Sequence, residues 1–233
     1  VVHTLDVPAI INQHTKSPRP YRAEKPVRNN LTAGSTLLLG AMGRVCMPTS
    51  KRGWWGWAKT TSVEYLLRQS LRKIDSQHFW DLMGALPVES IAKIERELVE
   101  KTFKIYNFQT DTLFFDTTNF FTYLDTTNLR CTIAQRGKNK QKRYDLRQIG
   151  LAMVVTRKDM IPLFHLTYQG NMADAVVFRD VIETIKDRMK GLGLDREKHT
   201  VVFDRGNNSR DNMAIVERLS LHYVGALTPY HHK

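Results

Sequence analysis

The sequence predicts an α/β protein in which a mixed sheet flanked by helices follows a small, mostly helical N-terminal domain. Up to about residue 106, apolar residues recur at helical spacing. After residue 107, short apolar runs bounded by turn residues alternate with helical patterns. The 233 residues, 42% of them hydrophobic, suffice for one well-buried domain and a smaller one. We therefore divide the chain into a helical domain over 1–106 and an α/β domain over 107–233.

The N-terminal domain opens with a stretch that lacks a sustained period. Residues 1–30 contain four prolines among scattered basic residues, which indicates an extended or loosely packed segment. Helices are expected over 35–47, over about 62–74 after a capping-box sequence, over a short segment from Ser76, and after Pro87. The tryptophans at 54, 55 and 57 can stack on bases or pack on a neighbouring helix, and packing is the favoured interpretation.

The second domain reads as β, β-hairpin, α, β, α, β. A strand is predicted over 111–116, a hairpin from strands 149–156 and 161–167, and a helix capped by Asp174 and closed by Gly191 and Gly193. A strand over 199–204, a helix over 209–219 and a strand over 222–227 complete the pattern.

Two aspartates stand out because each follows a short apolar run and precedes a polar turn. Asp116 ends Leu-Phe-Phe-Asp, and Asp204 ends Val-Val-Phe-Asp. Carboxylates at the ends of neighbouring strands can hold a divalent metal, although a lone aspartate in such a place is more often a turn or cap residue. Asn119, Asn207 and Asn208 follow them and would orient the aspartates, contact phosphate, or serve only as turn residues.

The charge balance favours a polyanionic partner. Lys and Arg number 35 against 23 Asp and Glu, a formal charge of +12. One loop concentrates this charge, with six basic residues against the single acid Asp145, and would track a DNA backbone or remain a solvated loop. The six are Arg136, Lys138, Lys140, Lys142, Arg143 and Arg147.

Several protein classes are disfavoured. The apolar runs are far shorter than the roughly 20 residues that cross a bilayer, and no signal-peptide order opens the chain. Two cysteines provide neither a disulfide framework nor a zinc cluster. We expect a cytoplasmic protein without a membrane partner.

Five motifs resemble the insertion-sequence DDE transposases in order and spacing. They cover 107–233 strongly and the N-terminal part loosely. The motifs are Phe115-Asp-Thr-Thr-Asn-Phe-Phe121, Ala134-Gln-Arg-Gly137, Lys142-Arg-Tyr-Asp-Leu-Arg-Gln148, Tyr168-Gln-Gly-Asn171 with Asp174, and Phe203-Asp-Arg-Gly-Asn-Asn-Ser209.

This resemblance implies a ribonuclease H-like core with Asp116 and Asp204 as catalytic and metal-binding residues. It further implies two Mg²⁺ ions, replaceable by Mn²⁺, that promote strand cleavage and transfer of the freed 3′-hydroxyl to target DNA. The expected partners are double-stranded DNA, as element ends and target, and further copies of the chain. The resemblance also implies a prokaryotic, nucleoid-associated protein whose N-terminal domain binds the DNA ends of the element or mediates assembly. The family's third acid, a glutamate on a late helix, matches neither Glu183 nor Glu217, so we expect a fragment that stops before it.

Two alternatives stay open. The chain would be a non-catalytic, DNA-binding remnant of a transposase, or a metal-dependent ribonuclease H-like nuclease without strand transfer.

Overall fold

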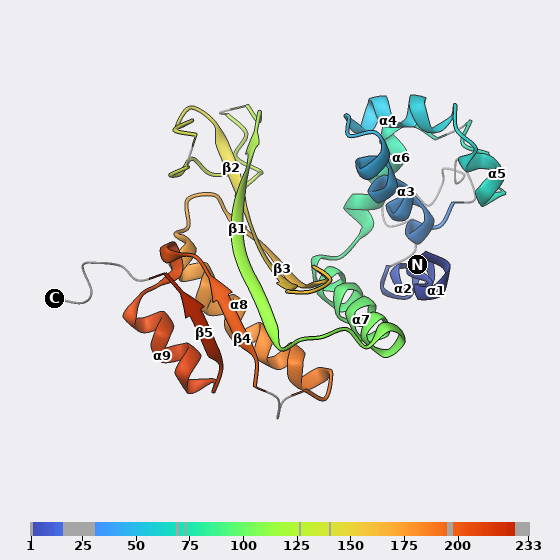
Figure 1. Ribbon diagram of the computed structural model, residues 1–233. Helices are drawn as coiled ribbons and strands as arrows, with labels where there is room; N and C mark the ends of the chain where they lie inside the picture. Colours follow the sequence, from blue (N-terminus) through green and yellow to red (C-terminus); the bar gives the residue numbers. More distant parts are fainter. Residues whose placement is uncertain are drawn as a thin grey trace. The chain divides into compact units, whose positions relative to one another are not determined.

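The computed structural model describes residues 2–15, 31–68, 70–72, 74–125, 127–139, 141–194 and 198–226. The chain divides into two compact units, Val1–Lys101 and Thr102–Lys233. Figure 1 shows the elements of both.

The described part of the first unit is helical. Its elements are α1 (Val2–Leu5), α2 (Val7–His14), α3 (Ala33–Cys46), α4 (Lys51–Ala58), α5 (Val63–Leu67), α6 (Ser76–Ala85) and most of α7 (Val88–Tyr106). The expectation of an extended segment over 1–30 is therefore wrong for 2–14, while 16–30 lie outside the described residues. Pro8 lies in the first turn of α2, where its missing N–H is no loss, and Ile10 and Ile11 are buried.

The core of this unit confirms the packing interpretation of the tryptophans. Trp54 and Trp55 are buried with Leu39, Leu71 and Ile74, and the two indole rings meet edge to face at 4.4 Å between centroids. Trp57 is partly buried against the same cluster.

The helix expected over about 62–74 is shorter in the structure. It ends at Leu67 because Arg68 takes a left-handed conformation, with φ of 51°. The Glu64 carboxylate accepts the backbone N–H of Leu71 beyond that end and does not close a capping box. The helix after Pro87 is confirmed as α7, in which Ile91 is 39% exposed and Val99 is buried.

The described residues of the second unit form one five-stranded mixed sheet in the order β3-β2-β1-β4-β5. The strands are β1 (Thr112–Thr122), β2 (Arg147–Thr156), β3 (Pro162–Gln169), β4 (Thr200–Phe203) and β5 (His222–Gly225). β1 pairs antiparallel with β2 and parallel with β4, and β5 runs parallel to β4. The predicted hairpin is confirmed as β2 and β3.

β1 is about twice as long as the predicted strand over 111–116. Its pairing with β4 covers Thr112–Phe114, whereas its ladder with β2 continues from Leu113 to Thr122. Figure 1 shows β1 and β2 extending together past β4. Asp116 therefore lies within β1, at the point where β1 has left β4.

Helix α8 (Asp174–Gly191) supplies the main apolar cover of the sheet. Its fully buried side chains include Val177, Phe178, Val181, Ile182 and Ile185, and the helix packs on β2, β3 and α9 (Arg210–Arg218). Ser209 caps α9 by accepting the Asn212 N–H. In the described part of the chain, no helix is both long enough and apolar enough to cross a membrane.

Candidate metal and nucleic-acid site

The pairing of β1 with β4 ends two residues before each of the two predicted aspartates. Leu113 is paired with Val201 and Phe114 with Val202. The same register, continued for two residues beyond Phe114 and Val202, would set Asp116 beside Asp204. Asp204 keeps an extended backbone, with φ of −78° and ψ of 171°, although β4 ends at Phe203.

Three phenylalanines fix the face on which these aspartates lie. Phe115 and Phe203 both contact the ring of Phe178 on α8, at centroid distances of 5.2 and 4.7 Å. Side chains alternate along an extended chain, so the next residue on each strand points to the opposite side of the sheet. Asp116 and Asp204 are accordingly exposed while their preceding residues are buried.

A short 3₁₀ helix, η1 (Arg205–Asn207), orients Asp204. Its carboxylate Oδ1 accepts the Gly206 backbone N–H at 3.0 Å and the Asn207 side-chain amide at 2.8 Å. Asn207 is buried, and its own carbonyl accepts Nδ2 of the buried Asn212 at 2.9 Å. Nδ2 of Asn212 also donates to the Ala175 carbonyl of α8 at 3.0 Å.

Asp116 lies near Tyr168, whose hydroxyl is hydrogen-bonded to Asp174. The Thr117 backbone N–H donates to Asp116 Oδ1 at 2.7 Å. On β3, the Tyr168 hydroxyl donates to Asp174 Oδ1 at 3.1 Å, and burial together with Asp174 raises the pKa of Tyr168 to about 12. Asp174 is the first residue of α8, and its expected capping role is wrong because Ala173 occupies the cap position without a side-chain bond.

Two of the predicted supporting asparagines do not join the aspartates. Asn119 lies three residues beyond Asp116 within β1, so the alternation of the strand places it on the other face of the sheet. Asn208 donates its side-chain amide to the Ala226 carbonyl at 2.8 Å. Asn207 is the supporting residue that the structure brings to Asp204.

Hydrogen bonds from the buried residue Gln148 hold the basic loop in place. The buried Gln148 donates Nε2 to the Lys138 carbonyl at 3.0 Å and to the Gly170 carbonyl at 2.7 Å, and its backbone pairs with Gln135. Arg136, Lys138 and Lys142 are exposed above this anchor.

Three other members of the predicted basic set differ from these. Arg143 makes two hydrogen bonds to Asp145, at 2.9 and 2.8 Å, and these lower the Asp145 pKa to about 2. Arg147 donates to the Asn128 carbonyl at 2.8 Å and is half-buried. Lys140 lies outside the described residues.

The donor set at the two aspartates is chemically suited to a hard divalent cation. Both offer carboxylate oxygens, the ligands that Mg²⁺ and Mn²⁺ favour, and Asp204 is held by donors on one oxygen only. Within the described ranges, no three His, Cys, Asp or Glu side chains gather as a metal-binding group. Glu183 instead accepts a hydrogen bond from Arg218.

Sequence reasoning missed two polar contacts of α8, the bond from Asn212 to the Ala175 carbonyl and the bond from Tyr168 to Asp174. Asn212 is a buried polar residue inside an amphipathic helix, and a polar side chain on an apolar face is the signal that would have found it. The bond from Tyr168 to Asp174 joins residues six apart across a strand-to-helix turn, which no periodicity reveals.

No protein-family model and no curated protein matches the sequence. Among solved structures, a piggyBac transposase synaptic complex with hairpin DNA aligns over 96% of this chain and 48% of its own, with 12% identity and a TM-score of 0.47. The Mos1 transposase catalytic domain with Raltegravir and Mn aligns over 59% and 60%, with 10% identity and a TM-score of 0.35. A Mos1 paired-end complex with the left transposon end aligns over 87% and 60%, with 11% identity and a TM-score of 0.34.

The chain thus spans about half the length of the piggyBac chain it resembles. Because these likenesses are loose, the functional proposal rests on the geometry of this chain.

Proposed function

We propose that the second unit is the ribonuclease H-like catalytic core of an insertion-sequence DDE transposase. In this proposal the protein cleaves a strand at an element end and joins the freed 3′-hydroxyl to target DNA. The observation that carries it is the parallel pairing of β1 with β4, whose register, continued two residues beyond Phe114 and Val202, would set Asp116 beside Asp204. The sheet order and the exposed basic loop agree with a core that acts on DNA.

In this function Asp116 and Asp204 would hold divalent metal, Mg²⁺ or Mn²⁺, through their carboxylate oxygens. The bound metal would polarise the scissile phosphate and activate the attacking hydroxyl. Asn207 and Gly206 donate to Oδ1 of Asp204, which leaves Oδ2 for a ligand. Phe178 fixes the spacing of the two strands beneath the carboxylates.

The exposed cations of the loop would bind the DNA backbone. Arg136, Lys138 and Lys142 each offer a charge to a phosphate, and every neutralised phosphate steepens the salt dependence of binding. Arg143 contributes less than its sequence position suggests because Asp145 already pairs with it.

Calorimetric titration of Mn²⁺ into the protein with a short DNA duplex tests the proposal. The wild type should bind Mn²⁺ with a measurable heat, and the double variant Asp116→Asn with Asp204→Asn should show no such heat. Asp159→Asn, an exposed acid in the turn between β2 and β3, is the matched control and should bind as wild type does. Equal Mn²⁺ binding by the double variant would reject the assignment.

A non-catalytic DNA-binding remnant is the second candidate, and one observation favours it. Within the described residues, no three His, Cys, Asp or Glu side chains form a group that could hold a metal ion. DNA binding that is unaffected by Mn²⁺, together with no cleavage of supercoiled plasmid by wild type, would select the remnant over the enzyme.

A further inference from the structure

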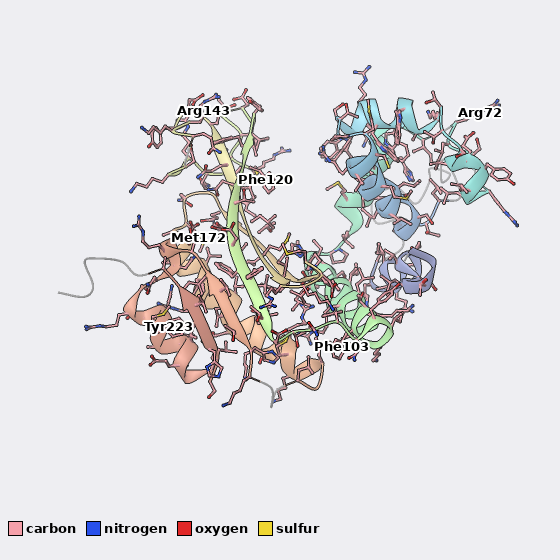
Figure 2. The ribbon with its side chains drawn as sticks, in the orientation of Figure 1. Arg72, Phe103, Phe120, Arg143, Met172 and Tyr223 are labelled. Atoms are coloured by element: carbon pink, nitrogen blue, oxygen red, sulfur yellow. The ribbon has the colours of Figure 1, made fainter. Side chains whose placement is uncertain are left out.

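Three aromatic side chains lie exposed at the end of β1 and β2 that extends past β4. Phe120 is 55% exposed, Tyr123 85% and Tyr144 58%. Aromatic side chains usually bury much of their area, so an exposed group of them marks an interaction surface. Figure 2 shows Phe120 and Arg143 in this region of the unit.

These rings stand on ordered structure. Phe120 is paired with Ile149 in the ladder of β1 and β2, and Thr122 Oγ1 donates to the Arg147 carbonyl at 3.2 Å. Arg147 in turn donates to the Asn128 carbonyl at 2.8 Å, which connects Asn128 to the first residue of β2. The backbone beneath this surface is therefore held by the hydrogen bonds of β1 and β2.

The loop that carries Tyr144 also carries exposed basic residues. They include Arg136, Lys138 and Lys142. The hydrogen bonds to Asp145 raise the pKa of Arg143, and Tyr123 lies close enough to add a smaller electrostatic contribution. Tyr123 is therefore near Arg143, the residue that precedes Tyr144 in this loop.

The surface also continues from the candidate metal site. Asp116, Thr118 and Phe120 alternate onto one face of β1, and all three are exposed. A strand of nucleic acid that passes Asp116 along this face would meet Phe120 next.

We propose that this surface, formed by Phe120, Tyr123, Tyr144 and the neighbouring loop cations, binds single-stranded DNA by stacking on unpaired bases. Duplex DNA hides the faces of its bases and would engage only the cations, whereas unpaired bases expose the faces that aromatic side chains stack on. The inference deepens the proposed function by naming the form of the substrate, and it rests on that proposal only for the choice of DNA as partner.

Fluorescence anisotropy with an oligothymidylate of about 16 nucleotides and with the matching duplex tests this surface. Tyr123→Ala should weaken single-strand binding by about tenfold or more and leave duplex binding within about twofold. Tyr123→Phe keeps the ring and should bind as wild type does. Tyr65→Ala is the matched control, because Tyr65 is 83% exposed on α5 in the other unit, and it should change neither affinity.

Loss of single-strand affinity in Tyr123→Ala, with rescue by Tyr123→Phe, supports the inference. Unchanged single-strand affinity in both Tyr123→Ala and Phe120→Ala, or an equal loss on duplex, overturns it. The Mn²⁺ titration of Asp116 and Asp204 reports separately on the proposed catalytic function, so failure of one is distinguishable from failure of the other.

Discussion

The side-chain amide of Asn207 donates to Asp204 Oδ1 across 2.8 Å from a position that is itself buried. A donor held in this way fixes the orientation of the carboxylate before any ligand arrives. Such outer contacts to a ligating carboxylate are worth about 10- to 100-fold in metal affinity.

Asn207→Ala should therefore weaken Mn²⁺ binding by about 10- to 100-fold, measured by calorimetry in the presence of duplex DNA. Asn208→Ala is the control, because the Asn208 amide donates to Ala226 and not to Asp204. Equal losses in the two variants would show that η1 was damaged as a whole and that Asn207 has no orienting role.

Asp116→Asn should lower DNA strand cleavage by at least about a hundredfold while duplex affinity changes little. Amide and carboxylate have nearly the same shape, so the strand and its packing on Phe178 should persist. The measurement is nicking of a supercoiled plasmid beside an anisotropy titration of a duplex. Cleavage close to the wild-type rate would remove Asp116 from the site.

Asp145→Asn should strengthen duplex binding, because it releases Arg143 from its two hydrogen bonds. Lys138→Gln should weaken binding and reduce the slope of log affinity against log salt by about 0.9. Arg143→Gln should lower affinity less than Lys138→Gln does. The reverse ranking would contradict the pairing of Arg143 with Asp145.

The ionisation of Tyr168 makes the stability of the folded protein depend on pH in the alkaline range. Its pKa is about 12 in the folded protein against about 10 for an unfolded tyrosine, so the folded state holds the proton more tightly. Protonated Tyr168 therefore stabilises the folded state. This contribution is complete below about pH 10 and is lost as the pH rises through about 12.

Tyr168→Phe should accordingly flatten the fall in melting temperature over that interval, measured by circular dichroism. The variant should also lack the highest-pH step in the tyrosinate absorbance titration. A titration identical to that of wild type would show that Tyr168 ionises as an ordinary tyrosine.

Gly150→Ala should destabilise the protein by about 1–3 kcal/mol. A Cβ at this position would lie 2.2 Å from the ring of Tyr168, which must then move. Gly84→Ala in α6 meets nothing within 4 Å and should be neutral or slightly stabilising, since alanine favours helix. Denaturant unfolding of both variants tests the pair.

The sheet and its two aspartates were accessible from sequence because apolar runs, turn residues and capping signals are local. Once β1 and β4 are recognised as neighbouring parallel strands, an arrangement with Asp116 beside Asp204 can be expected. The length of β1 was not accessible, because Thr117 to Thr122 lack an apolar run and are held in the strand by the ladder with β2. The predicted cap at Asp174 was wrong for a similar reason. An aspartate before a helix usually signals a cap, whereas here the carboxylate accepts a hydrogen bond from the Tyr168 hydroxyl.

The departure of β1 from β4 after Phe114 leaves the edge of β1 from Phe115 to Thr122 without a strand partner among the described residues. Open edges invite pairing with another chain, and a charged side chain in the strand opposes it. Asp116 is the charged residue in that stretch, so we expect it to oppose pairing of this edge with another chain. Its neutral variant should therefore be checked for oligomer size before any lost activity is assigned to chemistry.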